Sequence, residues 1–562
     1  MDYEKTIISW LETETGETGL SLEMPKDTAH GDYAFPCFIL AKKLQKAPQI
    51  IASELSDRFS LEQVQVAAIG PYLNFTILDN SKQIETLKHI LSGNIIQKTA
   101  EPKVVLIESP GPNTNKPLHL GHLRNMLLGI SLTHALRAIG KTVHTVNVNN
   151  DRGIHICKSM LAYQLFGDGK TPQSEGRKSD HFVGDYYVKF AQACAESEER
   201  KTELENQAQE MLTKWEAGDQ EVLALWKKMN DWCLAGFQET YKRMGLTIEK
   251  EYFESETYQG GKDIILKGAE DGLFYKNEKG AIEADLEDKG LGKKVLLRSD
   301  GTSVYITQDI NMAHLRYQDF SFDEMIYIVG NEQEYHFKVL FELFRMLGWS
   351  FGESCRHFSY GMIELPEGKM KSREGNVIDT DDLIKTVDGL AYEAVKERYE
   401  DLDEAEMNER ARAISTGAIR FFFLKFDPLK NFVFNPKESL SFEGETGPYV
   451  QYTHARISSI LRKSDAGNPT FTHLNADEDK QLLKQLGEFQ SVVERMAEEL
   501  RPSALCQYLI KVCQQFNSYY SKHQVIQEDK DVEADRVALL SAVQKVLKAG
   551  LEILGITALE RM

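Results

Sequence analysis

A strand, a long helix and a second strand follow one another between residues 104 and 148. The first strand is the apolar run at 104–107, and the helix is predicted at 118–139, where Gly140 stands in the position that ends helices. Residues 142–148 alternate polar and apolar side chains, as a strand does. Because two strands joined by such a helix lie parallel in one sheet, the pattern predicts a parallel sheet covered by helices.

The chain has 562 residues, too many for one core, and its pattern changes along its length. Residues 1–97 are predicted to form a small α+β domain. Residues 98–384 hold the parallel sheet, with a charged helical insertion at about 170–260. A helical connector at 385–440 and a helical domain at 441–562 follow. The expected fold class is therefore multidomain α/β with a helical C-terminal domain.

The charge balance excludes few functions. The chain carries 66 basic and 86 acidic residues, a net charge of -20, which counts against general nucleic-acid binding but permits a local basic face. No apolar run is long enough to span a membrane and no signal or transit peptide is evident, so no membrane partner is expected. The seven cysteines are scattered, odd in number and contain no Cys-x-x-Cys pair, so a reduced cytoplasm is expected and a structural zinc site is not.

The helix predicted at 118–139 begins with the segment His119-Leu-Gly-His122. From the frequencies of histidine and glycine in this chain, such a segment is expected by chance roughly 0.02 times. A helix N-terminus offers N–H groups and a positive dipole to phosphate, and two imidazoles there can stabilise charge developing at the α-phosphorus of ATP. Gly121 leaves room for a flat base. The alternative is that both histidines only cap or pack the helix start.

A second segment, Gly368-Lys-Met-Lys-Ser-Arg-Glu-Gly375, follows a strand predicted near 357–365. Its lysines belong either to an ordinary surface loop or to a basic arm that folds over a triphosphate. Together with the histidine segment it predicts the two sides of one ATP site, with Mg²⁺ on the pyrophosphate part. The expected chemistry joins a carboxylate to the α-phosphate of ATP and releases pyrophosphate.

These two segments resemble the HIGH and KMSKS signatures of class I aminoacyl-tRNA synthetases. Four stretches are similar to the arginyl-tRNA synthetases in particular: 112–125, 305–310, 330–336 and 445–456. The N-terminal domain resembles the additional domain of that family, and the C-terminal helices resemble its anticodon-binding domain. The resemblance implies a Rossmann-like catalytic domain that attaches arginine to tRNA(Arg) through an arginyl-adenylate, releasing AMP and pyrophosphate.

The resemblance also implies which residues bind ATP: His119, Gly121, His122, Lys369, Met370 and Ser372. The catalytic residues it implies are His119, His122, Lys116 and Lys369. Ser372 departs from the family pattern, because it stands where the second lysine of KMSKS would fall. Family members without that lysine tend to carry one just before the HIGH segment, so Lys116 is expected to supply the missing charge.

Asp309 is the candidate partner of the arginine side chain, because one carboxylate matches the parallel N–H donors of a guanidinium. Tyr305 lies four positions earlier and faces the same side if a helix begins here. The alternative is an acid at a helix start beside a packed tyrosine. By resemblance, the arginine pocket consists of Asn113, His122, Tyr305, Asp309 and Gln333.

Helical residues near 450 interleave aromatic and polar side chains, which suit unstacked RNA bases. The predicted tRNA contacts are Tyr449, Gln451, Tyr452 and Arg456, and the alternative is that these are half-buried helix residues. The expected partners are tRNA(Arg), arginine and ATP, for a monomer without a resident metal. Three rival functions fit parts of the pattern: a synthetase for another amino acid, a small-molecule nucleotidyltransferase, and a tRNA-binding paralogue without catalysis.

Overall fold

The structure is a computed structural model that describes residues 3–25, 30–61, 63–77, 81–98, 102–258, 260–364, 379–399 and 402–562. The predicted basic arm at 368–375, with Lys369, Met370 and Ser372, lies outside the described residues. The chain divides into two compact units. One consists of Met1–Ser92 with Leu474–Gly487, and the other of Gly93–His473 with Glu488–Met562.

The first unit contains a three-stranded antiparallel sheet. Its strands are β1 (Tyr33–Pro36), β2 (Val64–Ile69) and β3 (Tyr72–Ile77), in the order β1-β3-β2. The helices of this unit are α1 (Tyr3–Thr15), α2 (Phe38–Leu44), α3 (Pro48–Arg58), α4 (Ser81–Leu91) and, from the C-terminal region, α18 (Asp477–Gly487). Its fully buried core includes Ile7, Leu11, Phe35, Leu73 and Phe75. Nothing in the sequence pattern indicated that α18 belongs here.

The second unit is built on a five-stranded parallel sheet in the order β11-β10-β4-β5-β6. Its strands are β4 (Val104–Glu108), β5 (Thr142–Asn149), β6 (Lys250–Phe253), β10 (Glu324–Gly330) and β11 (Cys355–Tyr360). The predicted parallel, Rossmann-like sheet is confirmed. Strand β4 lies centrally, with β5 on one side and β10 on the other, and in open α/β sheets ligands bind beyond the strand ends at such a point.

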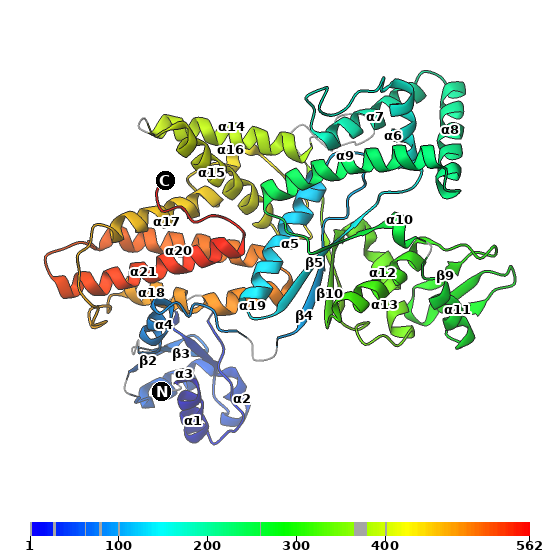
Figure 1. The fold of residues 1–562 in the computed structure, drawn as a ribbon. Coiled ribbons are helices and arrows are strands. Elements are labelled where there is room, and N and C mark those ends of the chain that lie inside the picture. Colours follow the sequence, from blue (N-terminus) through cyan, green and yellow to red (C-terminus); the bar gives the residue numbers. More distant parts are fainter. Residues whose placement is uncertain are drawn as a thin grey trace. The chain divides into compact units, whose positions relative to one another are not determined.

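Helices cover both faces of this sheet. Helix α5 (Leu120–Ala138) lies on one face, and α12 (Tyr305–Phe320) and α13 (Glu334–Met346) lie on the other (Figure 1). On the face of α12 and α13, the core includes Leu106, Met325 and Phe344. Burial on both faces explains why β4 is a continuous apolar run instead of an alternating one.

The segment between β5 and β6 is helical. It consists of α6 (Ile154–Phe166), α7 (Ser179–Cys194), α8 (Glu198–Glu216) and α9 (Gln220–Met244). The range predicted as an insertion, 170–260, therefore contains three of these helices but also β6, which pairs with β5 in the main sheet. Four residues are too few to show the alternation that marks a strand, so β6 could not be recognised.

A small antiparallel sheet follows, which the pattern also did not indicate. After α10 (Glu254–Thr257) and α11 (Lys262–Glu270), its strands are β7 (Tyr275–Lys276), β8 (Ile282–Leu286) and β9 (Gly292–Leu297). Strand β9 leads through a short turn to the start of α12. The small sheet thus lies immediately before the helix that carries Tyr305 and Asp309.

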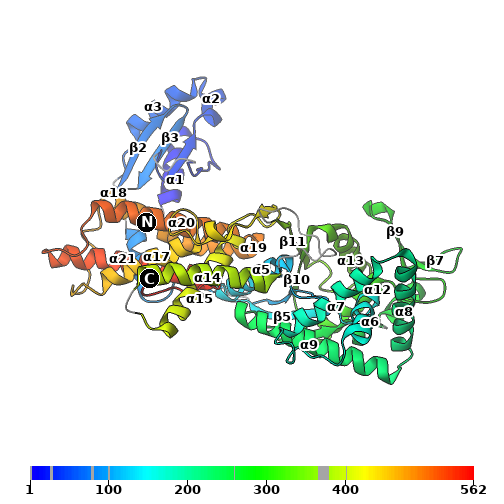
Figure 2. The same cartoon turned by 90° about the horizontal axis from the view of Figure 1, so that it is seen from above.

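The chain after 380 is mainly helical, as predicted. Its longer helices are α14 (Thr380–Arg398), α15 (Glu404–Leu424), α17 (Gly447–Leu461), α19 (Phe489–Glu499), α20 (Pro502–Lys522) and α21 (Lys530–Ile553), with the short α16 (Pro436–Ser439) between α15 and α17. Both views show α17, α20 and α21 side by side (Figures 1 and 2). One short pair, β12 (Ile363–Glu364) with β13 (Phe432–Val433), was not expected. None of the described helices has the length and apolar character needed to cross a bilayer.

Candidate active site

The histidine segment forms the entrance of α5, next to the carboxyl end of β4. His119 is the N-cap residue, and its Nδ1 accepts a hydrogen bond from the Gly121 N–H at 3.1 Å. The Nδ1 of His122 accepts from the His119 N–H, also at 3.1 Å. The two rings stack, with centroids 3.8 Å apart and planes at 21°. A backbone N–H only donates, so each Nδ1 is unprotonated and the proton of each neutral ring is on Nε2.

Both imidazoles are neutral near pH 7. Burial, and then the charge of Lys116, lower the pKa of His119 from 6.5 to about 4. Burial also lowers the pKa of His122 well below 6.5, and His119 and Lys116 add to this effect. Burial lowers the pKa of Lys116 as well. The entrance therefore presents two neutral Nε2–H donors and one lysine close enough to act electrostatically on both rings.

Gly121 keeps the two rings in this arrangement. A Cβ atom at position 121 would lie 2.9 Å from Cε1 of His119, closer than side chains tolerate. A larger residue would have to displace the ring from its cap position. The steric reason for glycine here is thus the neighbouring imidazole, in addition to the room for a base that the sequence suggested.

The start of α14 contacts this entrance. Asp379 is the first described residue after the segment that contains Lys369, and it forms an antiparallel bridge with His119. The N–H of Thr380 donates to the carbonyl of Leu118 at 2.8 Å. These bonds join the start of α14 to the entrance of α5.

A cavity of about 150 Å³ lies between α12 and the sheet. Tyr305 and Asp309 both line it, from the first turns of α12, and its apolar wall includes Met312, Phe337 and Leu340. Tyr305 is 79% exposed, so its ring stands at the mouth of the cavity, available to cover a bound molecule.

Three carboxylates line this cavity: Glu108, Glu254 and Asp309. Glu108 is neutralised, because its Oε2 lies 2.5 Å from Nη1 of the buried Arg316. Burial raises the pKa of Glu254, and the charges of Asp151 and Asp309 raise it further against the opposing effect of Arg152. Glu254 and Asp309 therefore repel each other across the cavity, and a cation placed between them would relieve that repulsion.

Sequence reasoning missed Glu254. It follows β6 directly, just as Glu108 is the last residue of β4, so both occupy the carboxyl ends of parallel strands. Recognition of β6 as a strand would have identified Glu254, because functional side chains gather at that edge of a parallel sheet.

Asp309 has a partner that holds it in place. Its Oδ2 lies 2.7 Å from Nε2 of His336, on the first turn of α13. His336 therefore restrains the carboxylate while Oδ1 remains available to a ligand. This imidazole belongs to the stretch 330–336 that was singled out in the sequence, although no role was predicted for it.

A larger cavity of about 920 Å³ adjoins the first and shares Asn150, Glu254, Tyr305 and Gln308 with it. Asn113 lines this larger cavity and pairs with Asn150 in an isolated parallel bridge. Of the predicted arginine-binding residues, Asn113, Tyr305 and Asp309 thus line connected space. His122 and Gln333 line neither cavity. Gln333 is exposed at the start of α13, in the turn Asn331–Gln333.

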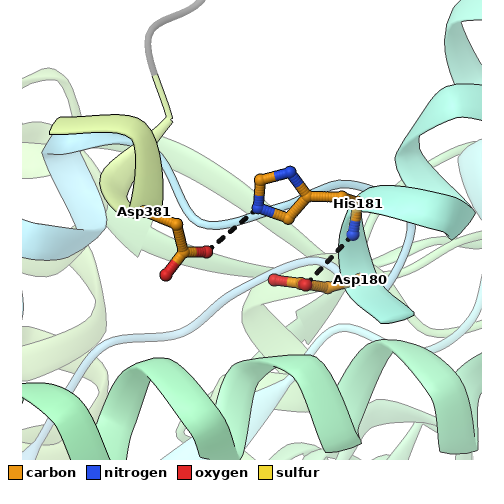
Figure 3. A group of neighbouring side chains, drawn as sticks. All are labelled: Asp180, His181 and Asp381. Carbon is orange, nitrogen blue, oxygen red and sulfur yellow. Dashed lines mark hydrogen bonds and ion pairs between the residues drawn. The ribbon is translucent and has the colours of Figure 1, made fainter. Parts of the chain in front are cut away.

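Asp180, His181 and Asp381 have the spacing of a possible metal site (Figure 3). A cation of the protein is already among them, because Nζ of Lys178 lies 3.1 Å from Asp180 and 2.7 Å from Asp381. The His181 Nε2 lies 3.0 Å from the same oxygen of Asp381. We interpret the group as an ion-pair network that fastens the start of α14 to α7.

The predicted tRNA residues on α17 are divided between surface and core. Tyr452 is 38% exposed, and the guanidinium of Arg456 lies 4.6 Å from the ring centre of Tyr520. The hydroxyl of Tyr449 accepts a hydrogen bond from Asn517 at 2.9 Å. Gln451 is fully buried, and its Nε2 donates to the carbonyls of Ala413 and Thr557. Such burial does not fit the contact with tRNA predicted for Gln451.

Three family models match the chain. Residues 86–436 match the tRNA synthetases class I (R), catalytic domain. Residues 4–77 match the arginyl tRNA synthetase N terminal domain, and residues 450–562 match the DALR anticodon binding domain.

Curated relatives and a solved structure are similar over nearly the whole length. The arginine–tRNA ligase of Treponema denticola is 46% identical over 97% of this chain and 95% of its own. That of Bacteroides fragilis is 44% identical over 97% of this chain and 96% of its own. The structure of the Thermus thermophilus arginyl-tRNA synthetase aligns with a TM-score of 0.82 at 28% identity, covering 100% of this chain and 99% of the other.

Proposed function

The chain belongs to the class I arginyl-tRNA synthetases and attaches arginine to tRNA by way of an adenylate, and we propose how its own residues divide that work. In the first step an oxygen of the arginine carboxylate attacks the α-phosphorus of ATP, and pyrophosphate leaves. In the second, a hydroxyl of the terminal ribose of tRNA, the 2′-hydroxyl in this class, attacks the carbonyl carbon of the adenylate, and AMP leaves.

The entrance of α5 stabilises the first transition state. The Nε2–H groups of His119 and His122 donate to the oxygens of the α-phosphate as negative charge grows on them. Lys116 supplies a positive charge from the same loop, and Lys369 supplies a second from the other signature segment. The neutrality of both histidines near pH 7 supports this role. A neutral imidazole whose Nδ1 accepts a backbone hydrogen bond has one N–H donor, and that donor points in a fixed direction.

ATP reacts as its magnesium complex in this proposal. The cation is part of the substrate and neutralises the departing pyrophosphate. Positioning and charge then supply the rate enhancement, and no side chain is needed as a nucleophile.

The carboxylates of Asp309 and Glu254 select arginine. Asp309, held by His336, and Glu254 bind the guanidinium from two sides, and Tyr305 closes the mouth of the cavity. A guanidinium has enough N–H donors for two carboxylates, whereas a lysine ammonium lacks the planar fork that matches them. The observation that carries this assignment is a cavity lined by both Glu254 and Asp309, with Oδ1 of Asp309 available to a ligand.

The exposed and half-buried residues of α17 contact the anticodon loop in this proposal. Tyr449 and Tyr452 offer faces for base stacking, and Arg456 offers charge and a planar surface. Gln451 is left out because it is buried.

We further propose that the protein acts as a monomer in the cytoplasm. Light scattering on the purified protein tests the monomer, and fractionation of the source cells tests the location.

Arginine-dependent exchange of labelled pyrophosphate into ATP, with and without tRNA, tests the activation step directly. Exchange with arginine but not with lysine is expected, in at least one of the two conditions. If neither condition supports exchange, the proposed assignment of the site is wrong.

A further inference from the structure

A third cavity, of about 610 Å³, shares no lining residue with the two cavities of the proposed active site and has no role in the reaction described above. The end of α9, the middle of α15 and the segment after α21 form its walls. Among the described residues, six basic side chains line it, against three acidic ones. The basic residues are Lys242, Arg243, Arg410, Arg412, Arg420 and Arg561. This excess is opposite in sign to the chain as a whole, whose net charge is -20.

Much of this positive charge is uncompensated. Arg410 is paired with Glu406 at 2.8 Å, and Arg243 is paired with Asp388 at 2.6 Å. Within the described ranges of the chain, Lys242, Arg412 and Arg561 make no ion pair. All three are exposed, so an anion in the cavity could reach them from solvent.

Arg420 reduces the electrostatic repulsion that an anion would meet in the cavity. It is 4% exposed, its guanidinium donates to the carbonyls of Met244 and Leu554, and its Nε has no partner among the described residues. Those carbonyls terminate α9 and α21, whose C-terminal ends carry partial negative charge. The guanidinium therefore screens two helix ends that would otherwise repel a phosphate.

Among the residues that the structure describes, no carboxylate forms an ion pair with Arg420. Burial, and then the charge of Arg243, lower the pKa of Arg420 to about 10. An anion in the cavity would offset part of the free-energy cost of burying this charge, because arginine and phosphate form strong, charge-assisted hydrogen bonds.

The cavity is near the helix proposed to hold the anticodon loop. Gln451 of α17 donates to the carbonyls of Ala413 and Thr557, and both of these residues line the cavity. The cavity wall and the exposed residues of α17 therefore belong to one packed assembly. At about 610 Å³, the cavity is large enough for a stretch of sugar–phosphate backbone and not merely for one ion.

We propose that this cavity binds backbone phosphates of tRNA through Lys242, Arg412 and Arg561, with Arg420 as the residue that screens the helix ends behind them. This inference rests on the proposed function, because it takes tRNA as the partner. Such contacts add affinity that depends on salt and not on base sequence.

The test measures the affinity of the full-length protein for a tRNA(Arg) transcript between about 50 and 200 mM salt, the range over which counterion release is evident. Arg412→Gln and Lys242→Gln should each lower the slope of log affinity against log salt by about one, and the double variant by about two. At low salt the double variant should bind roughly tenfold or more weakly. Lys279→Gln, an exposed lysine in the β7–β8 turn without an ion pair among the described residues, serves as the matched control and should leave both quantities unchanged.

Aminoacylation assays on the same proteins distinguish failure of this inference from failure of the proposed function. The variants should keep the wild-type kcat at saturating tRNA and show a raised KM for tRNA. If the wild type charges tRNA and the double variant has the same slope and affinity, this inference is overturned while the proposed function stands. A wild type that does not charge tRNA contradicts the proposed function itself.

A titration with inorganic phosphate distinguishes the source of the anion. The proposal expects phosphate to compete weakly with tRNA in the wild type and less in the double variant. If phosphate raises the Tm of the wild type but not of the double variant, while tRNA affinity is identical in both, the cavity binds a free anion and the tRNA proposal is wrong.

Discussion

Two imidazoles in contact would repel each other if both were charged, and the entrance of α5 avoids this by keeping them neutral. Each Nδ1 accepts a backbone N–H, so each ring contributes to the helix cap and has its Nε2–H left for a substrate. The same two bonds that begin the helix thus set the tautomer that the reaction needs.

The catalytic contribution of His119 should be independent of pH across the neutral range. The pKa of His119 is lowered to about 4, so its neutral form is fully present above 6.5 and is lost only as the pH falls toward about 4. His119→Gln should slow pyrophosphate exchange about 10²- to 10³-fold, as loss of one transition-state donor does. The ratio of wild-type to variant rates, measured from pH 8 to 5.5, should stay constant; a ratio that declines near pH 6.5 would contradict the neutral pair.

Substitution of Asp309 or Glu254 should raise KM for arginine and leave KM for ATP nearly unchanged. Asp309→Asn and Glu254→Gln keep the shape of each side chain but remove its charge. Each lost charged hydrogen bond costs about 1.5 to 3 kcal/mol, a change of roughly 10- to 150-fold in arginine affinity. His336→Gln should have a smaller effect, because it loosens Asp309 without removing the charge. Equal KM values in wild type and Glu254→Gln would exclude Glu254 from the pocket.

At the scale of elements, the start of α14 is held from two directions. Its first residues bond to the entrance of α5 through Leu118 and His119, and to α7 through the network of Lys178, His181 and Asp381. This network therefore fixes the start of α14 relative to both α5 and α7.

The network should make stability depend on pH through His181. Burial alone would lower the pKa of His181, but the hydrogen bond to Asp381 and the charges of Asp379, Asp180 and Asp381 outweigh burial and raise it. The stabilisation is therefore fully present below 6.5 and is lost as the pH rises through the raised pKa. His181→Gln should cost about 1 to 3 kcal/mol at pH 6 and less at pH 9, measured as free energy of unfolding.

His89→Gln, an exposed histidine on α4, is the control and should show no such dependence. A cost of His181→Gln that grows with pH would have the wrong sign for this network.

At the scale of the whole molecule, the C-terminal end of α21 contacts both a helix of the catalytic sheet and α15. Arg420 of α15 bonds to the ends of α9 and α21, and Nδ1 of His134 of α5 lies 3.0 Å from the carbonyl of Glu552. A helix of the active site and a helix of the C-terminal domain therefore share one polar junction.

Gly555→Ala should disturb this junction. Gly555 has a φ of +72°, and a Cβ there would overlap Nη1 of Arg420. Both effects destabilise, so we expect a loss of about 1 to 3 kcal/mol in the free energy of unfolding. Gly467→Ala is the matched control, because a Cβ at 467 has nothing within 4 Å. Unfolding in urea provides the measurement, and equal stabilities of the two variants would show that the junction tolerates displacement of Arg420.

The local pattern by itself determined the parallel sheet, the helix at 118–139 and the histidine segment at its start. Long apolar runs and helix boundaries can be recognised from consecutive residues, without reference to contacts between distant parts of the chain. The resemblance to a family, carried by short motifs, then supplied Asn113, Tyr305 and Asp309, which line connected cavities.

Only the tertiary structure decided the rest. Residues 250–253 form strand β6 because they pair with the backbone of β5. Glu254 reaches the cavity because β6 lies beside β5. The α17 pattern could not distinguish buried Gln451 from exposed Tyr452, since burial depends on which helices pack around α17. The burial that keeps His119 neutral and the excess charge of the basic cavity likewise arise from groups far apart in sequence, because desolvation and Coulomb interactions depend on distance in space.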